Sequence, residues 1–170
     1  MKIKFIIPFI ILFIFQLYML NNHFYSISAD ESAHTLDAYN FKLFGIWLPF
    51  QRMFLHYLLF DLFWTPRIIS MIIGHLALAS LMLVSKELFK DGMVTLLTGV
   101  LGALFVGIAV FSVLPLTEIY FFLFVLLSIY FLLKKSNWIY LTVILMTMTR
   151  YEGWLFALVF LVILIYRKSK

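Results

Sequence analysis

The sequence predicts an all-α membrane protein with about six transmembrane helices and two amphipathic helices in one outer loop. Hydrophobic residues make up 65% of the chain, and charged residues make up only 12%. A soluble domain is typically about 45–50% apolar. The basic residues also lie between long apolar runs rather than within them. We therefore expect an integral, multi-pass protein of the plasma membrane.

The first apolar run covers residues 5–20 and follows Lys2 and Lys4, which gives it the length and flank of a signal sequence. A signal peptidase site needs small residues after the run. Residues 20–23 instead read LNNH. We interpret the run as an uncleaved signal anchor that forms the first span.

Five further apolar runs follow a long loop. A span needs about 20 residues, so the last two runs are short and must draw on neighbouring residues or be shielded by other helices. We expect all of them to belong to one domain, residues 1–170. The runs are residues 68–84, 93–114, 116–133, 138–148 and 153–166. His75 lies within the second span and is expected to hydrogen-bond to another helix.

The placement of charges predicts that both termini are cytoplasmic. With the N-terminus inside, nine of the thirteen basic residues fall on the cytoplasmic side, which agrees with the positive-inside rule. Six of the eight acids then fall outside, so we expect the polar chemistry at the outer face. The inner basic residues are Lys2, Lys4, Lys86, Lys90, Lys134, Lys135, Arg167, Lys168 and Lys170, and the outer acids are Asp30, Glu31, Asp37, Asp61, Glu118 and Glu152.

Residues 21–66 form the only long loop, and we expect this extracytoplasmic loop to carry the functional site. Ser28 and Glu31 have the spacing of a capping box at a helix start. A first amphipathic helix is predicted from there to Phe44, before residues 45–49, and a second over residues 50–64.

Candidate metal ligands in this loop are few. Asp30, His34 and Asp37 share one face of the first predicted helix at positions i, i+4 and i+7. Two carboxylates and one His do not define a coordination geometry, so a divalent cation is a candidate cofactor without an assigned ion, and a plain surface role for His34 is the alternative. Cysteine is absent, and Walker A, GxGxxG, HExxH and GxSxG patterns do not occur. The basic residues form no patch, so we expect no nucleic-acid partner.

The order of the motifs resembles the GT-C membrane glycosyltransferases, in particular the group that holds protein O-mannosyltransferases and lipid A aminoarabinose transferases. The matching residues are Asp30-Glu31, residues 45–49, Arg67-Ile68-Ile69-Ser70, Pro115-Leu116-Thr117-Glu118 and Thr149-Arg150-Tyr151-Glu152-Gly153. The resemblance implies transfer of a sugar from a polyprenyl-phosphate donor to a glycan, lipid or protein acceptor at the extracytoplasmic face. Members of this family are usually longer and have more spans, so by the resemblance we expect the chain to be an N-terminal portion of such an enzyme, with a natural short form or half of a split system as the alternatives.

Transfer from a lipid-linked sugar phosphate needs a carboxylate that accepts the acceptor's proton and cations that stabilise the departing phosphate. By the resemblance Asp30 is the general base, and Glu31 is the second catalytic candidate, although helix capping explains Glu31 equally well. Arg67 is a candidate phosphate ligand, with a snorkelling interfacial anchor as the alternative. The remaining substrate-binding candidates are Arg52, His34, Arg150, Glu152 and Glu118.

The last three of these candidates have an alternative of their own. Glu118 and Glu152 either face the outer cavity with Arg150 as their partner or form a plain interfacial ion pair.

Two other classes of protein share this composition. A small multi-pass transporter would place its acids inside the spans near the membrane midplane, whereas here they cluster at one face. A non-catalytic lipid-handling or assembly subunit fits equally well and differs only in the role of Asp30.

Overall fold

The computed structural model describes residues 3–23, 64–114 and 116–168, and all regular secondary structure in these ranges is helical. This confirms the all-α prediction for the described part of the chain. The elements are a short 3₁₀ helix η1 (Ile3–Ile6) and the α-helices α1 (Ile7–His23), α4 (Trp64–Phe89), α5 (Gly92–Leu104), α6 (Val106–Phe111), α7 (Thr117–Leu133), α8 (Trp138–Thr147) and α9 (Glu152–Lys168). The two amphipathic helices predicted before α4 fall on residues 24–63, which lie outside the described residues.

Two of the described helices are long and apolar enough to cross a membrane. They cover Lys4–Asn21, with 18 residues, and Arg67–Phe89, with 23 residues. The helices Gly92–Leu104, Thr117–Leu133 and Trp138–Thr147 are apolar but shorter. Length and composition alone therefore identify two candidate spans among the described residues.

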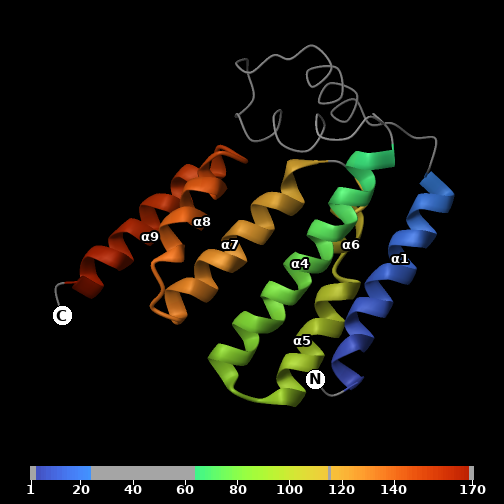
Figure 1. Ribbon diagram of the computed structural model, residues 1–170, viewed down its shortest axis with the longest axis horizontal. Coiled ribbons are helices and arrows are strands. Elements are labelled where there is room, and N and C mark those ends of the chain that lie inside the picture. The colour runs from blue at the N-terminus through green and yellow to red at the C-terminus, as the bar shows by residue number, and fades with distance from the viewer. Residues whose placement is uncertain (1–2, 24–63, 115, 169–170) are drawn as a thin grey trace, which may run out of the picture.

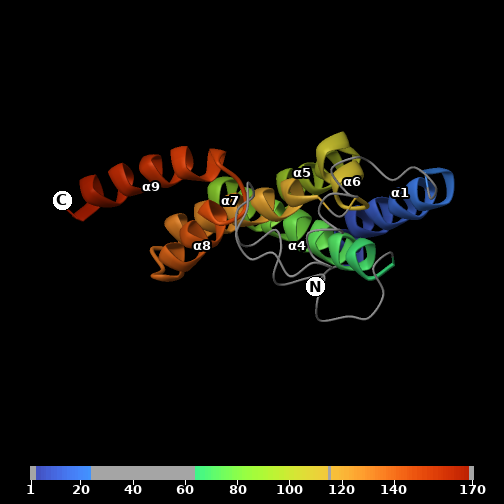
Figure 2. The same ribbon diagram turned by 90° about the horizontal axis from the view of Figure 1, so that it is seen from above.

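The helices pack side by side, with α4 near the middle (Figure 1). Helix α4 contacts α1, α5 and α6 on one side and α7 on the other, and α7 in turn contacts α8. Helix α9 packs against α8 at one edge of the assembly. Seen from above, the helices form a thin slab, with α9 at one end and α1 at the other (Figure 2).

Several helix ends gather on one side of this slab. Lys134 Nζ lies 2.6 Å from Glu87 Oε1, which joins the end of α7 to the end of α4. Arg167 Nη1 donates a hydrogen bond of 3.1 Å to the Leu132 carbonyl oxygen and so brings the end of α9 to α7. We call this side the lysine end, because Lys86 in the last turn of α4 and Lys90, Lys134 and Lys135 in the two connecting turns lie there.

The two turns at the lysine end are tight for identifiable reasons. Asp91 caps α5, since its side chain accepts hydrogen bonds from the backbone N–H groups of Met93 and Val94. Lys90 and Lys135 end the preceding helices with φ of 54° and 57°. These left-handed conformations are usual at the residue after a helix, where glycine is the favoured type.

The predicted run over residues 93–114 does not form one helix. It is broken at Phe105, whose extended backbone (φ −67°, ψ 119°) separates α5 from α6. The Phe105 ring folds over Gly107, where an added Cβ would lie 2.5 Å from Phe105 Cε1. The missing side chain therefore makes room for the ring at the break.

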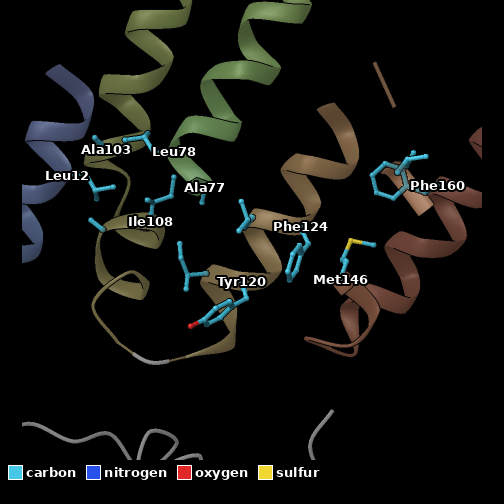
Figure 3. Close-up of a cluster of buried hydrophobic side chains, with 13 residues drawn as sticks. Leu12, Ala77, Leu78, Ala103, Ile108, Tyr120, Phe124, Met146 and Phe160 are labelled. Carbon is cyan, nitrogen blue, oxygen red and sulfur yellow. The ribbon is translucent and has the colours of Figure 1, made fainter. Parts of the chain in front are cut away.

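The core is a continuous cluster of buried apolar side chains that links all the long helices (Figure 3). It includes Leu12 from α1, Ala77 and Leu78 from α4, Ala103 from α5, Ile108 from α6, Tyr120 and Phe124 from α7, Met146 from α8 and Phe160 from α9. The outer faces are apolar as well: Ile14 is 61% exposed, and Leu155 of α9 is 65% exposed. Extensive exposed apolar surface is unusual for a soluble monomer.

One polar side chain lies inside this apolar core. Gln16 of α1 is fully buried, and its Nε2 donates hydrogen bonds to Ser112 Oγ at 2.9 Å and to the Met71 carbonyl oxygen at 3.4 Å. Ser112 is the residue that ends α6, and Met71 belongs to α4. A single amide therefore connects three helices.

The predicted hydrogen bond from His75 to another helix is wrong. His75 Nδ1 lies 2.9 Å from the carbonyl oxygen of Met71, four residues earlier in the same helix. The His75 ring instead stacks on Phe9 of α1, with ring centroids 6.2 Å apart. The carbonyl oxygen of Met71 lies one helical turn before His75 and within reach of Nδ1, so this nitrogen needs no partner from another helix.

Candidate functional site

Three charged side chains from two distant stretches of sequence meet at the end of the slab opposite the lysine end. Arg150, in the turn between α8 and α9, donates from Nη2 to Glu152 Oε1 at 2.9 Å and from Nε to Glu152 Oε2 at 3.2 Å. Its Nη1 donates to Oε1 of Glu118. We call Glu118, Arg150 and Glu152 the ionic cluster. The guanidinium of Arg150 thus ties α7 to the α8–α9 turn.

The local sequence explains why both carboxylates lie here. Glu118 and Glu152 occupy the first turns of α7 and α9. A negative charge in the first turn of a helix interacts favourably with the helix dipole. Two helix starts therefore bring two carboxylates to the same end, and Arg150 offsets the repulsion between them.

The cluster is partly shielded from solvent. The side chains of Arg150 and Glu118 are 29% and 32% exposed, whereas that of Glu152 is 55% exposed. Hydrogen bonds from Arg150 hold the pKa of Glu152 below its ordinary value. The hydrogen bond to Glu152, assisted by the charge of Glu118 and opposed by partial burial, raises the pKa of Arg150. Arg150 and Glu152 are therefore both charged at neutral pH.

A small apolar cavity of about 230 Å³ lies beside the cluster. Glu118 and Arg150 supply its polar rim. Its apolar lining consists of Phe105, Ile108, Phe111, Ile119, Phe121 and Phe122, so the helix break at Phe105 forms part of the wall. Binding sites for small molecules usually measure roughly 300–1,000 Å³. This cavity therefore suits a segment of an apolar chain better than a whole sugar phosphate.

Arg67 lies in the first turn of α4 and is only 3% exposed. A snorkelling anchor keeps its charged head at the aqueous or headgroup boundary. The burial of Arg67 argues against that alternative. Phosphate binding by Arg67 stays a prediction.

The other predicted site residues lie outside the described residues. They are Asp30, Glu31, His34, Asp37 and Arg52, which include both catalytic candidates and all three candidate metal ligands. Within residues 3–23, 64–114 and 116–168, no group of three or more His, Cys, Asp or Glu side chains is arranged to hold a metal ion.

From the sequence, Lys86 and Lys90 were assigned only to the cytoplasmic side of the membrane. A cavity lined by both residues was not predicted. The structure places both on a larger cavity at the lysine end. Their i, i+4 spacing at the end of an apolar run, which on a continuous helix would place both on one face, is the signal that could have indicated it.

Replacing Glu152 by Gln tests the ionic cluster. For an ion pair this exposed, we expect the free energy of unfolding to fall by about 0.2–1 kcal/mol at neutral pH. Arg150 lowers the pKa of Glu152 in the folded chain, so this stabilisation is present above the ordinary value of 4.5 and is lost as the pH falls through the lowered value. Thermal unfolding across this range should show the two proteins converging in acid. A difference that does not change with pH would contradict the assigned ion pair.

No protein-family model, curated protein or solved structure matches the chain.

Proposed function

We propose that the chain is a multi-pass plasma-membrane protein that transfers a sugar from a polyprenyl-phosphate donor to a glycan, lipid or protein acceptor at the extracytoplasmic face. One observation carries the proposal. Glu118, Arg150 and Glu152 come from two motifs 32 residues apart and converge in one cluster. This cluster lies at the end of the slab where α1 finishes and α4 begins (Figure 1). Residues 24–63, which carry Asp30 and Glu31, connect those two helix ends.

In the proposed reaction, the acceptor hydroxyl attacks the anomeric carbon of the sugar while the bond from that carbon to the phosphate oxygen breaks. Asp30 takes the hydroxyl proton as general base. Polyprenyl phosphate leaves as an anion, and a guanidinium such as that of Arg67 stabilises it, because guanidinium groups match phosphate oxygens well. The apolar cavity beside the ionic cluster would receive part of the prenyl chain.

Six crossings form the proposed topology, with α5 and α6 together making one crossing. The exposed apolar outer faces and the concentration of lysines at one end support this arrangement. Both termini and the lysine end are then cytoplasmic, and the ionic cluster is extracytoplasmic.

Single introduced cysteines test this topology cleanly, because the natural chain contains no cysteine. In intact cells, a cysteine at Lys90 should resist a membrane-impermeant thiol reagent, and one at Tyr151 should react with it. Both should react after the membrane is permeabilised. Labelling of the Lys90→Cys variant from outside would overturn the proposed orientation.

The assay for function is transfer of labelled sugar from a polyprenyl-phosphate donor pool in proteoliposomes that contain either this chain or a longer parent protein. We expect the labelled product to appear only with protein and donor together. If donor lipid binds but no transfer occurs with either form, the chain is a lipid-handling or assembly subunit. The full pairing of Arg150 with two carboxylates favours that second candidate, because a guanidinium engaged in this way is a poor phosphate ligand.

A further inference from the structure

The cavity at the lysine end measures about 460 Å³, twice the size of the one beside the ionic cluster. Its wall is mostly apolar and comes from η1, α1, α4 and the start of α5, with Phe5, Phe9, Met82 and Leu83 among the lining residues. Lys86 and Lys90 also line it. The cavity therefore combines an apolar interior with ammonium groups where α4 ends.

The charges at this cavity are available for a ligand. Lys86 and Lys90 are exposed, and neither forms an ion pair within the described part of the chain. Lys134 differs, since it pairs with Glu87. Asp91 also lines the cavity, but its Oδ1 accepts hydrogen bonds from the backbone N–H groups of Met93 at 2.6 Å and Val94 at 3.1 Å. With two lysines and one carboxylate, the charged side chains at this cavity carry a net positive charge.

We propose that this cavity binds an anionic phospholipid, with an acyl chain between α1 and α4 and the phosphate at Lys86 and Lys90. A lysine ammonium is a suitable ligand for phosphate, and basic pockets between helices on the cytoplasmic side of a membrane hold anionic headgroups. The apolar wall selects a lipid over a soluble phosphate compound. This inference rests on the proposed membrane location but not on sugar transfer.

Native mass spectrometry of the purified chain in detergent tests the proposal. The probes are phosphatidylglycerol and phosphatidylcholine with identical acyl chains, and inorganic phosphate. A basic residue near an anionic headgroup contributes a factor of about five in affinity, so two lysines should favour phosphatidylglycerol by roughly 25-fold. Inorganic phosphate in equal amount should not displace the lipid. Displacement by phosphate would indicate a free-anion site and overturn the lipid assignment, as would equal binding of the two lipids.

Lys90→Gly and Lys135→Gly form a matched pair of variants. Each removes one exposed lysine and relieves a left-handed backbone, with φ of 54° and 57°, but only Lys90 lines the cavity. We expect Lys90→Gly to weaken phosphatidylglycerol binding about fivefold and Lys135→Gly to leave it within about twofold. Equal weakening by both would show that diffuse surface charge attracts the lipid, which contradicts a specific site.

Lys86→Gln provides a second, independent variant, because Lys86 is exposed and its loss disturbs no ion pair in the described residues. Combined with Lys90→Gly, it should reduce phosphatidylglycerol binding to the level of phosphatidylcholine. Helical content measured by circular dichroism checks that each variant is folded. These experiments measure bound lipid directly, so their outcome does not depend on whether the chain transfers sugar.

Discussion

Replacing Asp30 by Asn is expected to reduce sugar transfer by roughly 10²–10⁴-fold, the range typical of a positioned acid–base group. Asparagine keeps the size and part of the hydrogen bonding of aspartate but cannot accept the acceptor's proton. Donor binding should survive, because in the proposed mechanism cations rather than Asp30 hold the phosphate. The measurement is transfer of labelled sugar in proteoliposomes, normalised to folded protein, with this chain alone or within any longer protein that contains it.

Glu31→Gln is the control for that experiment. If Glu31 only completes a capping box, the change costs at most about 0.5–2 kcal/mol of helix stability and should reduce expression more than turnover per folded molecule. A normal transfer rate for the Asp30→Asn variant would instead remove the catalytic role of residues 21–66 and favour the lipid-handling subunit.

Gly153→Ala is expected to destabilise the α8–α9 hairpin by about 1–3 kcal/mol, the usual cost of overpacking. A Cβ at Gly153 would lie 2.4 Å from the Met146 carbonyl oxygen and 3.0 Å from Thr147 Cα. These are backbone atoms, so no side chain can rotate to relieve the contact. Thermal unfolding in detergent, followed by circular dichroism, should show a transition that is lower by roughly 2–12 °C.

Gly92→Ala is the matched control, since both glycines lie at helix starts. A Cβ at Gly92 would meet only Phe5 Cζ at 3.6 Å, an ordinary van der Waals distance. Alanine also has the higher helix propensity, so this variant should be at least as stable as the parent. Equal stability of the two variants would mean that the backbones of α8 and α9 are not held close together at Gly153.

The positions of the helices were the part of the fold that the sequence predicted most accurately, through its apolar runs. The run at residues 116–133 corresponds closely to α7 (Thr117–Leu133), and the run at 68–84 lies within α4 (Trp64–Phe89). Hydropathy could not predict the break at Phe105, because both sides of the break are equally apolar and the cause is how one ring packs over Gly107.

For the candidate site, the sequence predicted which residues take part but not how tertiary packing arranges them. Residue type and position nominated Glu118, Arg150 and Glu152, and adjacency in sequence already suggested the contact between the last two. The sequence offered Arg150 as a partner for Glu118 in one of two readings, but whether the two side chains meet across 32 residues depends on how α7 packs beside α8. The burial of Arg67 was unpredictable for the same reason: it depends on tertiary packing.

The buried amide of Gln16 has a consequence for how the protein is made. Translation delivers α1 first, whereas the Met71 carbonyl follows 55 residues later and the Ser112 hydroxyl 96 residues later. At roughly 5–20 residues per second, the nascent helix waits about 5–20 s for its last partner. In the proposed membrane location, the amide of a lone helix would until then face lipid without these partners, which disfavours early settling in the bilayer. If α1 crosses the membrane as proposed, we therefore expect it to remain beside the insertion machinery until α6 emerges, so that α1 takes its final place only after α4 and α6 have been made.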